Sequence, residues 1–179
     1  MRRTNRHDKG IIALAIGVLV VVIVLNIHKR MLYADLSKAV FEGNLPETER
    51  LLKKGASPIP TRGLLYVSLV NHHADIAKRL IDAGAEVDGR LLGLAVKLDE
   101  KEIALLLLQK GVDVKTGYRR FGVEEPLLHA AIGNDNREMV AELIRHKAPI
   151  DKAVEATGAT PLHLAIKRGN PEIAALLLE

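Results

Sequence analysis

The longest apolar run of the chain stands near its start and contains no charged residue. It extends from Ile11 to Ile27 and holds thirteen Ile, Leu or Val residues, two Ala, one Gly and one Asn. A helix of this length covers roughly 25 Å, near the lower limit for crossing the hydrocarbon core of a bilayer. Because the apolar residues cover every side of such a helix, a small soluble domain is not expected to bury it. The pattern predicts a transmembrane helix at 11–27, preceded by a basic flank at 1–10.

The residues after this run favour an uncleaved signal-anchor over a cleaved signal peptide. The juxtamembrane segment 28–32 carries no small residues of the kind that a signal peptidase needs. The small-x-small sequence Ser37-Lys38-Ala39 lies well downstream. We therefore expect the helix to be retained as a single-pass anchor.

The charges on either side of the run indicate an orientation. Four Lys or Arg residues precede it and three follow within comparable reach. Since cytoplasmic flanks carry the excess of positive charge, the repeats are expected on the periplasmic or another extracytoplasmic side. The cytoplasmic side is the alternative. The four are Arg2, Arg3, Arg6 and Lys9, and the three are Lys29, Arg30 and Lys38.

Beyond residue 33, apolar and turn-forming residues recur with a long period. A leucine marks each of five units, at spacings of 29, 27, 36 and 34 residues. A residue suited to a turn stands seven positions after each leucine, and in four units a second one stands twelve positions further on. A period near 33 residues is typical of stacked helix-turn-helix units that bury one another's apolar faces. The leucines are Leu36, Leu65, Leu92, Leu128 and Leu162; the turn residues are Gly43, His72, Asp99, Asp135 and Gly169, then Gly55, Gly84, Gly111 and Lys147.

The last unit carries the most specific motif of the chain. Thr160-Pro161-Leu162-His163 is followed by Gly169-Asn170 and a leucine run, and His129 repeats the histidine one unit earlier. This pattern resembles the ankyrin repeat family. The resemblance implies an all-α solenoid of helix-turn-helix units with short β-turn fingers. It extends in weaker form over 33–179, with units near 33–60, 61–88, 89–115, 124–151 and 158–179.

The resemblance also assigns structural roles, and the departures from it are informative. In the family the Thr160–His163 pair fixes a helix start by local hydrogen bonds. The first three units lack Thr-Pro, and their short spacings imply shortened fingers, whereas the 36-residue step adds length before unit four. The leucine pairs expected to bury against the next unit are Leu51-Leu52, Leu80-Ile81, Leu105-Leu106 and Leu176-Leu177.

Composition removes several classes of function. The pI near 9.4 suggests nucleic acid as a partner, but the excess charge belongs to the membrane flanks, because 20 Lys and Arg face 21 Asp and Glu from Met31 onward. The chain has no cysteine, and its histidines do not form a metal-binding i, i+4 pair. No nucleophile or phosphate-binding motif is present. We expect no catalysis, cofactor, metal, nucleic acid or small-molecule substrate.

A binding surface remains, and the resemblance indicates its place. Partners of ankyrin proteins usually contact the concave side, which is made by the fingers and the exposed ends of the first helices. Three of the residues at those ends are apolar and form the candidate patch, although shortened fingers would alternatively tilt them into the core between repeats. The register assigns Phe41, Glu42, Val70, Asn71, Lys97, Leu98, Lys167 and Arg168 to this surface, together with Gly133 and Asn134.

The long connection between units three and four is a second candidate. Lys115–Glu125 contains two of the five aromatic residues of the chain, Tyr118 and Phe121, on either side of Arg119 and Arg120. Aromatic residues and arginine dominate binding hot spots, and the flanking glycines would let the loop project. Alternatively, Phe121 packs under its own repeat.

These features predict a membrane-anchored protein–protein interaction module that acts as a scaffold or adaptor. Two alternatives share its topology. One is an inhibitor or immunity protein that binds a toxin or enzyme in the periplasm, and the other is an accessory subunit of an envelope enzyme.

Overall fold

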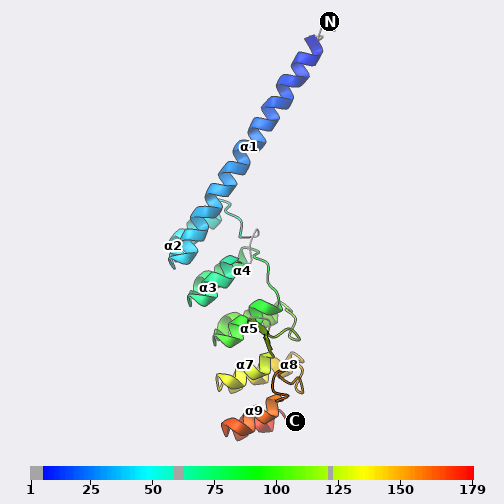
Figure 1. The fold of residues 1–179 in the computed structure, drawn as a ribbon. Helices are drawn as coiled ribbons and strands as arrows, with labels where there is room; N and C mark the ends of the chain where they lie inside the picture. Colours follow the sequence, from blue (N-terminus) through cyan, green and yellow to red (C-terminus); the bar gives the residue numbers. More distant parts are fainter. Residues whose placement is uncertain (1–5, 59–62, 121–122) are drawn as a thin grey trace.

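Paired helices stack along one direction from the N-terminus to the C-terminus (Figure 1). The structure is a computed structural model, and it describes residues 6–58, 63–120 and 123–179. Each pair is called a unit below and is numbered in chain order. The pairs are α1 (Arg6–Phe41) with α2 (Leu45–Lys53), α3 (Gly63–Val70) with α4 (Ala74–Asp82), α5 (Gly89–Lys97) with α6 (Lys101–Gln109), α7 (Leu127–Gly133) with α8 (Arg137–Arg145), and α9 (Pro161–Arg168) with α10 (Pro171–Leu176).

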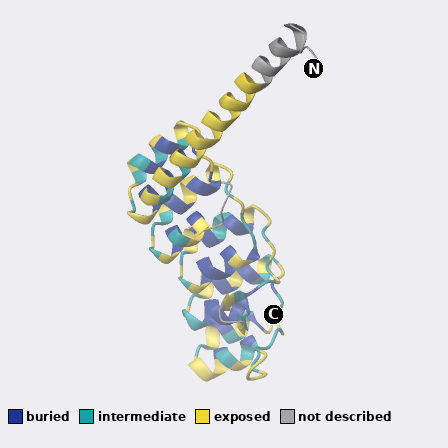
Figure 2. Cartoon of the chain, turned by 45° about the horizontal axis from the view of Figure 1, so that its top comes forward, coloured by how far each residue is buried: buried dark blue, intermediate teal, exposed yellow. Residues whose placement is uncertain are grey.

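Helix α1 runs unbroken from the apolar segment into unit one. Its residues from Ile16 to Ile27 are exposed, and the helix projects beyond the stack (Figure 2). From Leu32 onward one face becomes buried against the repeats. The helix Ile16–Phe41 contains an 18-residue window with a mean hydropathy of 1.7, and it is long and apolar enough to cross a membrane by length and composition. The expected borders of the anchor, juxtamembrane segment and repeats therefore all fall inside one helix.

The turn positions confirm the register inferred from the leucine spacing. All five residues between the paired helices have φ between 57° and 70°. Glycine adopts this left-handed conformation readily, and His and Asp are among the residues that tolerate it best. The four residues that end the second helices have φ between 65° and 89°, and among them Lys147 stands where the other units have glycine.

The core lies between consecutive units and is built from the marking leucines and the second helices. Leu36, Leu65, Leu92 and Leu128 are at most 2% exposed. One expected pair was wrong: Leu105 and Leu106 are only half-buried, whereas Leu107 and Leu108 are buried. Fifteen residues separate each marking leucine from the buried leucine of its second helix, and this spacing selects Leu107, Leu143 and Leu177 in the same way as Leu51 and Leu80.

The connection after unit three forms a strand pair. Strands β1 (Tyr118–Arg120) and β2 (Val123–Glu125) are antiparallel, with Tyr118 opposite Glu125. The base of this hairpin lies directly on α5, because a Cβ atom at Gly93 would be only 2.6 Å from the backbone nitrogen of Tyr118. Another glycine, Gly117, closes the hairpin base, since its Cβ would meet the carbonyl oxygen of Glu125. The expected loop is thus an ordered finger at its base.

Candidate protein-binding surface

An exposed apolar stripe crosses the first helices of units one and two. Phe41 is 68% exposed and Val70 43% exposed, and the two hold the same position in successive units. Tyr66, 50% exposed, lies one turn before Val70 on α3, and residues four apart share a helix face. Exposed apolar side chains that gather on adjacent elements are candidates for contact with a protein partner. Phe41, Val70 and Tyr66 are called the apolar stripe below.

Other residues of the predicted surface hold the units together. The amide of Asn71 donates to the carbonyl oxygen of Phe41, at 3.5 Å. In the same way Asn134 donates to the carbonyl oxygens of Val96 and Lys97, at 2.8 and 3.3 Å. Because these bonds join the ends of neighbouring first helices, the two asparagines have a structural role.

The remaining predicted residues divide between core and surface. Leu98 is half-buried and packs against the core. Lys97 forms an ion pair with Glu125, at 2.8 Å, which ties α5 to β2. Glu42 is exposed, with its carboxylate 3.9 Å from Lys38. Lys167 and Arg168 are exposed at the end of α9. The structure therefore does not gather all the predicted residues into one patch.

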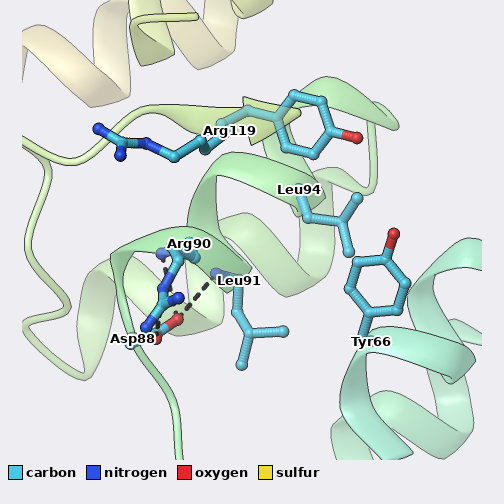
Figure 3. Close-up of a pocket in the computed structure, with 7 residues that line it drawn as sticks. Tyr66, Asp88, Arg90, Leu91, Leu94 and Arg119 are labelled. Atoms are coloured by element: carbon cyan, nitrogen blue, oxygen red, sulfur yellow. Dashed lines mark hydrogen bonds and ion pairs between the residues drawn. The ribbon is translucent and has the colours of Figure 1, made fainter. Parts of the chain in front are cut away.

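A cavity of about 250 Å³ opens between α3, α5 and β1 (Figure 3). Its apolar lining comes from Tyr66, Leu91, Leu94 and Tyr118. Arg90, Arg119 and Asp88 add polar groups. We call it the tyrosine pocket.

Backbone bonds and glycines position the walls of this pocket. The Asp88 carboxylate accepts hydrogen bonds from the backbone N–H groups of Arg90 and Leu91, both at 3.1 Å, and so caps α5. Gly93 brings β1 onto the same helix. Sequence reasoning missed Tyr66, Arg90 and Leu94. Gly89 and Gly93, four residues apart on one helix, were the signal that another segment approaches α5 closely.

The carboxylate of Glu124 holds the base of the hairpin together. Glu124 accepts bonds from Lys152 Nζ at 2.5 Å, from Arg119 Nη2 at 3.0 Å and from the Gly117 N–H at 3.1 Å. These bonds, led by the one from Lys152, lower the pKa of Glu124 to about 2. Tyr118 and Arg119 of the predicted loop thus have defined places. The structure places Arg120 in β1 without describing its side chain, and Phe121 lies outside the described residues.

The two motif histidines have different environments. The Nδ1 atom of His163 lies 3.3 Å from the Thr160 backbone nitrogen and 2.8 Å from the Thr160 hydroxyl, as the motif implies. His129 is buried and donates from Nε2 to the carbonyl oxygen of Ala159 in the next unit, at 2.8 Å. Within the described part of the chain its Nδ1 has no partner, because Pro126 stands where a threonine would cap α7. Burial lowers the pKa of His129.

Among the side chains that the structure describes, no three from His, Asp or Glu converge on a point that could hold an ion. The adjacent histidines contact different groups: His72 Nδ1 lies 2.7 Å from Glu100, and the His73 ring lies against Gly43.

Comparison with known proteins agrees with this geometry. Residues 92–179 match the family model described as Ankyrin repeats (3 copies). Residues 92–179 are ankyrin repeats. The chain is 32% identical over 125 residues to an ankyrin repeat protein of fowlpox virus (strain NVSL). It is 33% identical over 121 residues to Neurogenic locus notch homolog protein 2 of Homo sapiens.

These matches show the repeats and not a whole-protein function. Each covers 64% of this chain, but only 36% of the viral protein and 5% of the human one. Ankyrin repeats are protein–protein interaction modules and are typically non-enzymatic. The two helix pairs before residue 92 have the same left-handed turns as the matched repeats.

Proposed function

We propose that this chain is a single-pass membrane protein whose repeats serve as a scaffold or adaptor by binding a protein partner. The observation that carries the proposal is the apolar stripe, which leaves Phe41, Val70 and Tyr66 exposed on adjacent first helices. In this proposal the pairs at 33–60 and 61–88 are two divergent ankyrin units, so that the solenoid has five. The stripe lies on these two units.

The anchor is part of the proposal. The uncharged run at 11–27 and the exposure of its described residues support membrane insertion. Because α1 continues into unit one without a break, an inserted helix would hold the stripe near the bilayer. Tethering raises the effective concentration for a partner at the same membrane.

The orientation follows from the flanking charges, with the repeats on the extracytoplasmic side. Two reporters fused after Glu179 test it, one active only outside the cytoplasm and one only inside. A signal from the outside reporter is the expected result. A signal from the inside reporter contradicts the orientation and makes the partner a cytoplasmic protein.

The binding face is tested by substituting the stripe in the full chain. We expect Phe41→Ala with Val70→Ala to abolish crosslinking to the partner in the native membrane while the midpoint of thermal unfolding changes little. Ile150→Ala is the matched control, because Ile150 is 44% exposed but lies after α8. Crosslinking that survives the double substitution contradicts the proposed face, and a large loss of stability would show that the stripe belongs to the core.

A further inference from the structure

We infer that the tyrosine pocket binds one large apolar side chain of an acidic peptide segment in the partner. The inference rests on the proposed protein-binding function and names the chemistry of the segment. Three observations support it: the cavity is lined by apolar side chains, the exposed charges at its rim are positive, and the apolar stripe leads to it.

The size of the pocket fits a side chain. Cavities that hold small-molecule ligands usually measure about 300–1,000 Å³, whereas the tyrosine pocket measures about 250 Å³. Two of the three tyrosines of the chain line it, together with Leu91 and Leu94. Aromatic walls with an apolar floor favour a phenylalanine, leucine or similar anchor.

The charges at the rim are arranged asymmetrically. The side chains of Arg90 and Arg119 are 66% and 60% exposed, while their carboxylate partners Asp88 and Glu124 are only 25% and 17% exposed. Solvent, and any partner that replaces it, therefore meets guanidinium groups at the rim more than carboxylates.

The two carboxylates are also committed to the fold. Asp88 caps the first turn of α5, and Glu124 is shared among Lys152, Arg119 and the Gly117 N–H. Each guanidinium has five N–H donors, so an ion pair with one carboxylate leaves donors for a second one. Carboxylates beside the apolar anchor complement this rim.

The apolar stripe gives the peptide a path. Tyr66 belongs both to the stripe and to the pocket wall. A segment that lies along Phe41 and Val70 reaches the pocket at Tyr66, one helical turn nearer the N-terminus of α3. A membrane surface rich in anionic lipid would also meet the arginines, but it presents no side chain for the cavity.

The test uses the full chain in nanodiscs of zwitterionic lipid and a labelled peptide, Asp-Glu-Phe-Asp-Glu, with fluorescence anisotropy as the readout. We expect this peptide to bind and the peptides Asp-Glu-Ala-Asp-Glu and Lys-Lys-Phe-Lys-Lys to bind at least about tenfold more weakly. Tyr66→Ala and Arg90→Glu should each weaken binding about tenfold. Arg145→Glu, a charge reversal at a side chain that is 70% exposed on α8, should leave it unchanged.

Charge exchange separates binding from misfolding. Arg90→Glu should bind the lysine peptide more tightly than the unsubstituted protein does, which a misfolded variant cannot do. The inference is overturned if the acidic phenylalanine peptide does not bind. Equal binding of the alanine peptide also overturns it, as does selective binding to phosphatidylglycerol vesicles that depends on Arg90.

The result is distinguishable from failure of the proposed function. If the pocket inference alone fails, the peptide measurements are negative while Phe41→Ala with Val70→Ala still abolishes crosslinking to the partner. If the proposed function fails, that double variant crosslinks normally whatever the peptide does.

Discussion

The two ends of the first helices differ in how they join neighbouring units. At the C-terminal end, every interface uses the same two positions: a residue eight places after one marking leucine contacts the residue seven places after the preceding one. Asn136 donates to Asp99 at 2.6 Å, and Asn170 donates to Asp135 at 2.5 Å. The same positions hold His72 beside Glu100, and Gly43 beside the ring of His73.

At the N-terminal end, the fingers join the units in a different way each time. Unit three supports a strand pair on Gly93. In unit four, His129 donates a hydrogen bond to the carbonyl oxygen of Ala159. A cavity of about 490 Å³ lies between the hairpin and unit five. The tyrosine pocket lies between units two and three.

The difference shows that the C-terminal ends of the first helices set the spacing of the units, whereas the contacts at the N-terminal ends differ from one unit to the next. A repeated pair of contacts fixes the spacing of consecutive units, so that the fingers are free to vary. Substitutions at the variable edge should therefore have effects that differ from unit to unit, and four predictions test the contacts of this edge and of the turns.

The largest effect is expected where the hairpin meets α5. Gly93→Ala should lower the free energy of unfolding by about 2–3 kcal/mol, because the added methyl group meets the backbone of Tyr118. The measurement is denaturant unfolding of the full chain in micelles, followed by circular dichroism. Gly133→Ala is the control: with no described atom within 4 Å of its Cβ position, it should gain about 0.5 kcal/mol. Equal effects at both sites would contradict a tight hairpin contact.

The next effect concerns the carboxylate under the hairpin. Glu124→Gln should lower stability at neutral pH by about 1–2 kcal/mol, because three bonds lose their charged acceptor. The pKa of Glu124 is depressed from 4.5 to about 2, so its stabilisation is complete above about pH 4.5 and is lost as the pH falls towards 2.

Hydrogen exchange of the hairpin amides across this range measures the loss. In the glutamine variant this step should be absent, because the side chain does not titrate. A hairpin that opens with the same pH dependence in both proteins would assign the acid response to another group.

The helix caps of units four and five give a smaller, reciprocal effect. Thr160→Ala should destabilise by about 1 kcal/mol, because α9 loses its capping bonds. Pro126→Thr should stabilise by a similar amount, since it offers His129 Nδ1 the partner that it lacks among the described residues. Thermal unfolding of both variants tests the pair. A loss of stability in Pro126→Thr would mean that the proline itself holds the finger.

The smallest effect belongs to a turn. Lys147 has φ 65° at a position where units one to three have glycine. Lys147→Gly should stabilise by about 0.5 kcal/mol, because it relieves a left-handed conformation that costs side chains energy. Gly111→Lys, the reverse change in unit three, should destabilise by about the same amount. The two unfolding midpoints, compared with that of the unsubstituted chain, give the result.

Most of the regular edge, meaning the C-terminal ends of the first helices with their repeated contacts, could be predicted from the sequence. The spacing of the leucines located nine of the ten positive-φ residues in the described part of the chain, all except Gly158, because a repeat places equal residues in equal conformations. The same reasoning placed Phe41 and Val70 on the surface. It failed for Leu105 and Leu106, where a run of four leucines concealed which two face the next unit.

The irregular edge, meaning the N-terminal ends of the first helices with the fingers, could not be predicted in the same way. The sequence marked Tyr118 and Arg119 as candidates but did not bring them to Tyr66, Arg90 and Leu94. At the regular edge the sequence also missed two contacts, because Asn71 and Asn134 looked like surface residues, whereas each bonds to a carbonyl group of another unit. These contacts join residues 30 or more positions apart, across elements without a shared local pattern.

The sequence by itself determined the repeat, its register and the apolar segment before it, because helical period, turn conformation and hydrophobicity are local properties. Only the tertiary structure decided that α1 runs unbroken into unit one, that the hairpin lies on Gly93, and that two tyrosines and two arginines surround one cavity. The physical reason is close packing: which side chains share a pocket depends on how near two backbones approach, and Gly89 and Gly93 of α5 allow the close approach here.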